Sequence, residues 1–210
     1  MKKLFTIILL IMAINIKAYE NKYFKINIPD NFVQDDTKVP IYKWTNKDNN
    51  HENIVITVSK NDNHDQIKNY KTDDIINYEK YLKEQFDQKL KDYDINIEIN
   101  NTKKEILNGI YNLNYDVYWP TKEIIGYDTY QKGYIFTIND FIFVYNFTSD
   151  KSLLDNNYLI DSINSFKPND SIINSKNVKV KIVILTGIIA AIISTIAKYI
   201  IRSKKHKSNN

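Results

Sequence analysis

Residues 127–148 read YDTYQKGYIFTINDFIFVYNFT, and the fold class is most readily inferred from this stretch. Two runs rich in aromatic and β-branched residues, Tyr127–Ile138 and Phe141–Thr148, flank the dipeptide Asn139-Asp140. Such runs favour strands, and a short turn between them predicts a β-hairpin. Because Phe141–Thr148 is apolar on both faces, it is expected to be a central strand that is covered on both sides.

Alternating residues extend the expected sheet beyond this hairpin. In Tyr111–Trp119 the aromatic and aliphatic residues share one face, and Asn112, Asn114 and Asp116 lie on the opposite face. A period of two is typical of a strand. Further strands are expected over residues 23–28, 41–45, 53–59 and 95–101, and less regularly at 106–107.

Two segments have the spacing of helices. Apolar residues recur every three or four positions over Ile75–Tyr93, which predicts an amphipathic helix of about five turns. Thr72 or Asp73 can cap it. A second helix is expected over Lys151–Phe166, with Pro168 at its end. The order of strands, long helix, meander and closing helix predicts an α+β fold, an antiparallel β-sheet sandwiched by helices.

The N-terminus has the pattern of a secretory signal peptide. Lys2 and Lys3 precede the apolar run Leu4–Ile14, and Ala18 is a suitable cleavage position. Eleven apolar residues are too few to cross a bilayer, which takes about 20 in a helix. Residues 1–18 are therefore expected to be a signal peptide, followed by an extracytoplasmic domain over 19–168.

The other end of the chain has the length of a transmembrane helix. Ile182–Ile201 is twenty residues long with Lys198 as its one charge, and the tail 202–210 is basic. The positive-inside rule places this tail in the cytoplasm and the domain in the periplasm or at the cell surface. Residues 169–181 are expected to be a polar tether. Gly187 and Ala191 have the small-xxx-small spacing that permits self-association of such helices.

Charge and cysteine content exclude several classes of function. Ten of the 29 basic residues lie in the terminal segments, which leaves 19 basic against 25 acidic residues, a balance of −6. An acidic domain repels phosphate backbones, so no nucleic-acid partner is expected. The chain has no cysteine, which rules out disulfides, thiolate catalysis and cysteine-ligated zinc.

Two stretches resemble the PsbP-like superfamily, which includes DcrB-like bacterial lipoproteins and a Ran-binding transport factor. Tyr23–Phe32 (YFKINIPDNF) is similar to the family's opening strand and its Ile-Pro turn, and Tyr145–Lys167 (YNFTSDKSLLDNNYLIDSINSFK) to its last strand and C-terminal helix. The resemblance covers the extracytoplasmic domain only. It implies an α/β/α sandwich and an accessory or binding role, because the family shares no catalytic signature. A C-terminal membrane helix in place of an N-terminal lipid departs from the lipoproteins, so their partners do not transfer to this chain.

No catalytic constellation is recognisable. The chain lacks a G-x-S-x-G motif and clustered glycines, so neither a nucleophile elbow nor a phosphate loop is expected. Asp62, His64 and Asp65 are close in sequence, and His51-Glu52 could approach them across the loops to hold a divalent ion. The spacing matches no established metal loop, so these residues are interpreted as solvated. No enzyme activity, no cofactor and no metal is expected.

Aromatic residues offer the best candidate for a binding surface. Most of them are expected in the core, but Tyr118, Trp119, Tyr127 and Tyr130 adjoin the loop Pro120–Gly126 and are expected to form an exposed partner surface. The preferred hypothesis is a membrane-anchored, non-catalytic binding or scaffold module that acts on another cell-envelope protein. The alternative is a metal-dependent or hydrolytic envelope enzyme with an unrecognised site. A sensor is a third hypothesis, although the cytoplasmic tail is too short for an output domain.

Overall fold

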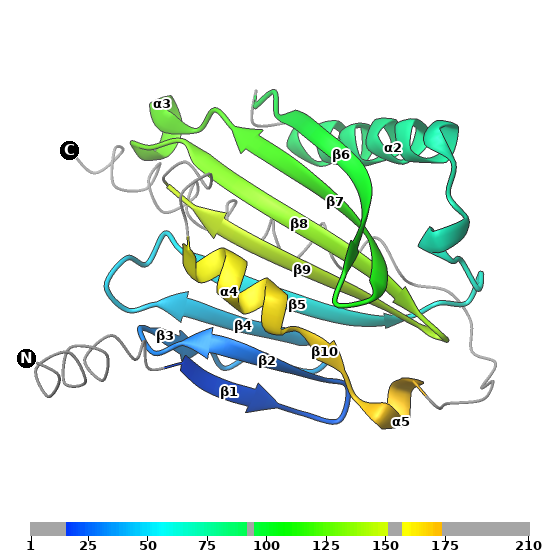
Figure 1. Ribbon diagram of the computed structural model, residues 1–210. Coiled ribbons are helices and arrows are strands. Elements are labelled where there is room, and N and C mark those ends of the chain that lie inside the picture. Colours follow the sequence, from blue (N-terminus) through cyan, green and yellow to red (C-terminus); the bar gives the residue numbers. More distant parts are fainter. Residues whose placement is uncertain (1–15, 92–94, 151–156, 174–210) are drawn as a thin grey trace, which may run out of the picture.

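The computed structural model describes residues 16–91, 95–150 and 157–173, and these form two antiparallel sheets with a few helices (Figure 1). The larger sheet has seven strands in the order β3-β4-β5-β9-β8-β7-β6. These strands are β3 (Phe32–Gln34), β4 (Ile41–Asn46), β5 (Asn53–Lys60), β9 (Phe141–Ser149), β8 (Thr129–Ile138), β7 (Ile110–Trp119) and β6 (Glu98–Leu107). The smaller sheet has the order β1-β2-β10, with β1 (Ile16–Glu20), β2 (Phe24–Pro29) and β10 (Lys167–Pro168).

Helices cover both faces of the larger sheet. The longest of the described helices is α2 (Thr72–Leu90), and α4 (Asn157–Ser165) lies on the opposite side (Figure 1). Three short elements complete the described residues: the 3-10 turn η1 (Ile67–Asn69) and the helices α3 (Lys122–Ile125) and α5 (Asp170–Ile173).

The predicted hairpin is confirmed as the centre of the larger sheet. Strand β9 lies between β5 and β8, and Asn139 at the turn has a φ of 50°. Phe143, Val144 and Tyr145 are all buried, so the strand is covered on both faces as expected. Because side chains alternate along a strand, β9 supplies residues to two separate cores.

One core lies between the sheet and α4, and the other lies between the sheet and α2. Phe143, Tyr145 and Phe147 belong to the first, which also takes the alternating apolar residues of β2. Val144 belongs to the second, together with Phe86 of α2. The layer opposite α2 is therefore partly a three-stranded sheet, whereas helices alone were expected there.

The alternation of side chains did not predict three of the strands. Strand β3 has three residues and β10 has two, which is too short for a periodic signal. Pro168 was expected only to end a helix, but α4 already ends at Ser165 and Pro168 pairs with Phe24 in the small sheet. Strand β1 pairs with β2, so the predicted cleavage position, Ala18, lies inside a strand.

The described ends of two elements differ from the expected ones. Helix α2 begins at Thr72, and the residue before it, Lys71, takes the cap position in place of Thr72 or Asp73. The Asp74 carboxylate accepts a hydrogen bond from the Lys71 backbone N–H at 2.7 Å. The expected strands at 95–101 and 106–107 are one strand, β6, with a register shift between Asn100 and Lys103.

Several predicted segments lie outside the described residues. They are most of the signal peptide, the greater part of the tether, the helix Ile182–Ile201 with Gly187 and Ala191, and the basic tail. Among the residues that the structure describes, no helix combines the length and the apolar character that a membrane crossing requires.

Candidate functional site

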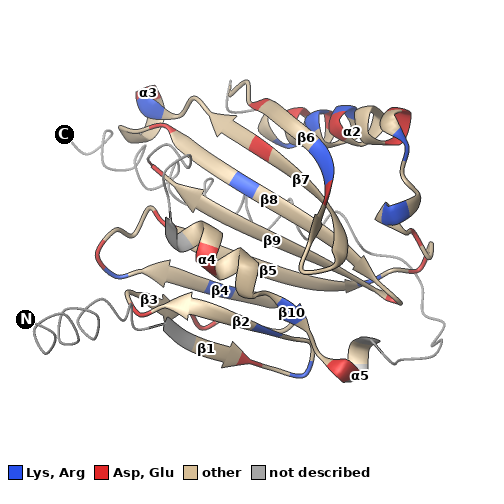
Figure 2. Ribbon diagram, viewed as in Figure 1, with Lys and Arg blue, Asp and Glu red and all other residues tan. Residues whose placement is uncertain are grey.

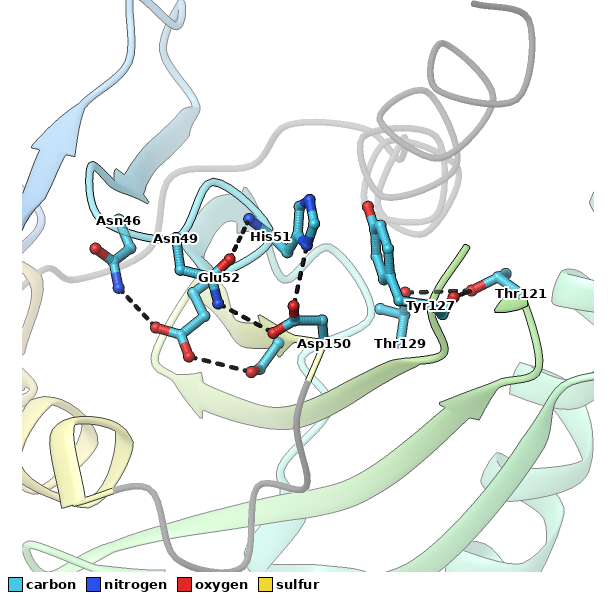
Figure 3. Close-up of polar contacts among 9 residues, drawn as sticks. Asn46, Asn49, His51, Glu52, Thr121, Tyr127, Thr129 and Asp150 are labelled. Atoms are coloured by element: carbon cyan, nitrogen blue, oxygen red, sulfur yellow. Dashed lines mark hydrogen bonds and ion pairs between the residues drawn. The ribbon is translucent and has the colours of Figure 1, made fainter. Parts of the chain in front are cut away.

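Polar and aromatic residues gather at the end of the larger sheet where β4, β7 and β9 end and where β5 and β8 begin (Figure 3). They form two groups. The first, here called the loop cluster, consists of Asn49, His51, Tyr127 and Asp150 from three different loops. The second, here called the polar row, crosses the sheet itself.

Asp150 organises the loop cluster. Its Oδ2 lies 3.0 Å from His51 Nδ1, and its Oδ1 accepts a hydrogen bond of 3.0 Å from the Asn49 side-chain amide. Burial acts to raise the pKa of Asp150, but the hydrogen bonds from Asn49 and His51 and the attraction of the His51 ring outweigh it, so the pKa lies below its ordinary value. The carboxylate therefore stays ionised and orients the imidazole.

Tyr127 closes the loop cluster from the other side. The His51 and Tyr127 rings are stacked, with 4.0 Å between centroids and 14° between planes. The Tyr127 carbonyl accepts a hydrogen bond of 2.9 Å from the buried Thr121 hydroxyl, which also lies 3.4 Å from the Thr129 hydroxyl. The stack holds the loop after β7 against the loop between β4 and β5, and the Thr121 hydrogen bond fixes Tyr127 within its own loop.

The polar row runs across neighbouring strands on the face that carries α4. Tyr130 pairs in register with Ser149 on one side and with Tyr118 on the other. The Ser149 hydroxyl donates to Glu52 Oε1 at 3.2 Å, and the Asn46 amide donates to Glu52 Oε2 at 2.7 Å. Both donors are needed because the Glu52 side chain is buried, and a buried carboxylate without hydrogen bonds is costly.

The far half of the row is aromatic. The Tyr118 and Tyr130 rings lie 5.3 Å apart, and both residues are half-buried. Two residues further along the same strands, Asp116 and Lys132 form an ion pair of 2.6 Å on the same face. Desolvation, a hydrogen bond to Asp128 and nearby negative charges raise the pKa of Tyr118, so its phenol stays protonated and polar at neutral pH.

All four predicted surface residues lie at this end of the sheet, and three of them, Tyr118, Tyr127 and Tyr130, are partly exposed. Tyr118 and Tyr130 are in contact, and Tyr127 lies in the loop cluster. Trp119 is the exception: it is fully buried against Phe86 of α2, with an edge contact of 5.2 Å between ring centroids. Because it follows Tyr118 in a strand, its side chain points to the opposite face, so the expectation that it is exposed was wrong.

The two histidines do not meet. His51 precedes β5 and His64 follows it, and eight strand residues span about 26 Å at 3.3 Å each. His64 lies 3.5 Å from Asp140 at the turn between β8 and β9, the opposite end of the sheet. A metal site shared by His51-Glu52 and His64 is therefore wrong. Within the described ranges, no three His, Asp or Glu side chains are close enough to hold a metal ion together.

The sequence interpretation treated His51 as a solvated residue. Its partner Asp150 is 99 positions away, so no local pattern could pair them. Asp150 directly follows the central strand β9, and Asn49 and His51 lie just before its neighbour β5. Their placement at the ends of adjacent strands is the one feature of the sequence that could have indicated that His51 and Asp150 are neighbours.

Comparisons with known proteins add information on the fold. No protein-family model and no curated protein matches the sequence. Among solved structures, the chain is similar to the PsbP protein of the cyanobacterium Synechocystis (CyanoP), with a TM-score of 0.52 and 11% identity over 74% of this chain and 94% of the cyanobacterial one. The described domain therefore has the PsbP-like fold that the sequence motifs predicted.

Two further structures resemble the chain more loosely. A protein from Bacteroides thetaiotaomicron matches with a TM-score of 0.48 and 14% identity over 73% of this chain, which spans about half (48%) of that protein's length. A protein of unknown function from Pseudomonas aeruginosa matches with a TM-score of 0.34 and 12% identity, over 64% of this chain and 82% of the other. Matches at this level of similarity carry no activity or partner to this chain.

Proposed function

We propose that this PsbP-like domain is a non-catalytic binding or scaffold module that contacts another cell-envelope protein through the tyrosine half of the polar row and the adjoining loop cluster. On this proposal the domain is held outside the cytoplasm by Ile182–Ile201, and it works in the periplasm or at the cell surface. The sequence supplies that location through its signal-peptide pattern and its basic tail.

The observation that carries the proposal is the Tyr118–Tyr130 pair beside the Asp116–Lys132 ion pair. Tyrosine supplies a large contact area at low entropic cost and a hydroxyl for hydrogen bonding, which is why it is enriched in interfaces. Half-buried rings on paired strands are already ordered, so binding costs little further ordering. A rigid, amphipathic patch of this kind suits a protein partner.

The loop cluster supports the same proposal. Its contacts join three loops at the edge of the patch, and two of these contacts are the His51–Tyr127 stack and the Asp150–Asn49 hydrogen bond. Loops that carry recognition residues bind best when a rigid scaffold positions them. The cluster therefore serves to fix the rim of the binding surface.

Cross-linking in cells tests the proposal. A photo-reactive phenylalanine is introduced at position 130 in the full-length protein, and the same group at position 81 of α2 provides a control, because Tyr81 is exposed on another face. A discrete envelope protein captured from position 130 and not from position 81 supports the proposal. Equal capture from both positions, or none from 130, contradicts it.

A specific observation favours one second candidate, a hydrolytic enzyme. An imidazole held by a carboxylate, as His51 is held by Asp150, is the usual arrangement of a general base. Hydrolysis of model esters or phosphate esters that disappears in His51→Gln would favour this candidate, and identical rates in the two proteins would remove it.

A further inference from the structure

Strand β6 is an edge of the seven-stranded sheet, and its first half has a groove beside it. On its inner side Glu98, Ile99 and Asn100 pair with β7. On its outer side β6 forms no backbone hydrogen bond with any residue that the structure describes. Such an edge presents a row of N–H and C=O groups that a further strand can pair with.

The groove lies between this edge and α2, and its volume is about 500 Å³. Three isoleucines line the groove: Ile97 and Ile99 on the β6 side and Ile76 on α2. The Ile76 side chain is 60% exposed. Side chains of a strand added outside β6 would alternate between this groove and the face that carries Tyr118. Every second residue of such a strand would therefore meet an apolar surface.

Lys83 fixes the wall of the groove. Its ammonium donates to Asp87 at 2.9 Å, to the Asn96 side chain at 2.7 Å and to the Ile97 carbonyl at 2.6 Å. These bonds tie α2 to the segment that leads into β6. The separation of helix and strand is thus held by the chain itself, and the groove is preformed.

The groove has an excess of negative charge that no ion pair among the described residues neutralises. Figure 2 shows acidic and basic residues side by side along α2. The two lysines of the groove have acidic neighbours on the same helix, since Lys83 pairs with Asp87 and Lys80 lies 4.0 Å from Glu84. Glu79 and Glu98 form no ion pair with any residue in the described part of the chain. The remaining charge that a ligand meets here is therefore negative.

An irregularity in β6 limits where a further strand can pair with its edge. The register shifts between Asn100 and Lys103, and Asn101 has a φ of 56°. Bulges of this kind bend a strand and interrupt a continuous edge. The part of the edge beside the groove, up to Asn100, is consequently separate from the lysine-rich part that follows.

We infer that the edge formed by Ile97 and the first residues of β6, Glu98 to Asn100, binds an extended segment of a partner protein by strand addition. The segment that fits alternates apolar residues with polar ones and carries a lysine or arginine to pair with Glu79 or Glu98. This inference deepens the proposed function, on which it rests, because Glu98 pairs in register with Tyr118 of the proposed surface. One partner could then contact the tyrosine face and the edge together.

The test uses the full-length protein and a synthetic peptide that alternates valine with lysine and threonine. Binding is followed by hydrogen exchange of the backbone amides and by titration. Strand addition predicts slowed exchange at every second residue between Ile97 and Asn100, because only alternate amides point outward. Protection in another part of the molecule, or none in β6, overturns the inference.

Two matched probes separate strand addition from adsorption to an acidic surface. Methylation of the alternate backbone nitrogens that would face β6 removes their N–H donors and leaves the charge of the peptide unchanged, so binding should be lost. In the protein, Glu79→Lys with Glu98→Lys should weaken binding about tenfold, a typical size for two lost charge contacts. The control is Asp30→Lys with Asp36→Lys, two exposed residues near the opposite edge of the sheet, which should leave binding unchanged. If the methylated peptide binds equally well, or both protein variants weaken binding alike, the inference is wrong.

The result is distinguishable from a failure of the proposed function. The peptide experiment requires no natural partner, and the cross-linking at position 130 requires no contact with β6. Capture at position 130 without peptide binding removes the strand-addition inference and leaves the binding module. Peptide binding without any capture at position 130 removes the proposed tyrosine surface and leaves strand addition at β6.

Discussion

The His51 imidazole lies parallel to the Tyr127 ring, with 4.0 Å between centroids, while Asp150 holds its Nδ1 at 3.0 Å. The three residues come from three loops, so one side chain joins the loop before β5, the loop before β8 and the end of β9. Their contacts position the rim of the proposed partner surface. The fold brings them together because β5, β9 and β8 are consecutive in the sheet.

Replacing His51 should loosen this rim. His51→Ala removes both the stack and the Asp150 contact, and we expect a loss of about 1–2 kcal/mol in unfolding free energy, with faster amide exchange at Tyr127. Denaturant unfolding and hydrogen exchange measure the two effects. The matched control is His64→Ala, since the His64 side chain is 65% exposed and lies at the other end of the sheet. Equal effects of the two substitutions would contradict the proposed role of His51.

The ionised Asp150 carboxylate of the loop cluster should make the folded protein less stable as the pH falls into the acid range. The pKa of Asp150 is lowered in the folded protein, so its contribution is present above the unfolded value of about 3.9 and is lost as the pH falls through the folded value. Asp150→Asn should therefore destabilise the protein at pH 6 and cost little at pH 2. Denaturant titrations at the two pH values give the comparison. A difference between the proteins that does not shrink in acid would be inconsistent with this account.

Gly133 is required by a ring that lies across it. A Cβ at this position would lie 2.2 Å from Cζ of Tyr115, whose hydroxyl donates to the buried Asn146 side chain at 3.2 Å. Gly133→Ala should destabilise the domain by about 1–3 kcal/mol or more, because an overpacked core must shift. Thermal unfolding measures this loss, and adding Tyr115→Leu should restore part of it. Gly109→Ala is the control: open space surrounds its Cβ position, although its φ of 78° adds strain.

Two neighbouring residues of β7, Tyr118 and Trp119, should lose very different amounts of stability on substitution. Trp119→Ala empties a fully buried site and should cost about 3–5 kcal/mol of stability. Tyr118→Ala removes a half-buried ring and should cost about 1 kcal/mol through its contact with Tyr130. Chemical denaturation distinguishes them. If the tyrosine variant proved as unstable as the tryptophan variant, Tyr118 would be a core residue and not a surface residue.

Much of the fold could be predicted because its centre is periodic. The alternation in Tyr111–Trp119 and the doubly apolar Phe141–Thr148 correctly identified strands β7 and β9 and the burial of β9 on both faces. The polar face of β7 was less predictable, since Asn112 and Asn114 are fully buried and donate to Glu105. Amide N–H groups that donate to a neighbouring strand leave no trace in a hydropathy pattern.

The candidate site could be predicted only in part. Tyr118, Tyr127 and Tyr130 are near one loop in sequence, so their proximity followed from the β7–β8 connection. Trp119 was misplaced because a list of neighbouring aromatics ignores the alternation that sends it to the other face. The pairing of His51 with Asp150 depends on the order of strands in the sheet, which one-dimensional patterns do not encode.

The most direct measurement of the central claim is the affinity of the full-length protein for the partner captured from position 130. With Tyr118→Ala and Tyr130→Ala together, we expect the dissociation constant to rise at least about tenfold, as when an interface loses an aromatic anchor. Tyr81→Ala, an exposed tyrosine on α2, should leave it unchanged. An unchanged affinity in the double variant, or an equal loss in Tyr81→Ala, would show that the tyrosine face is not the binding surface.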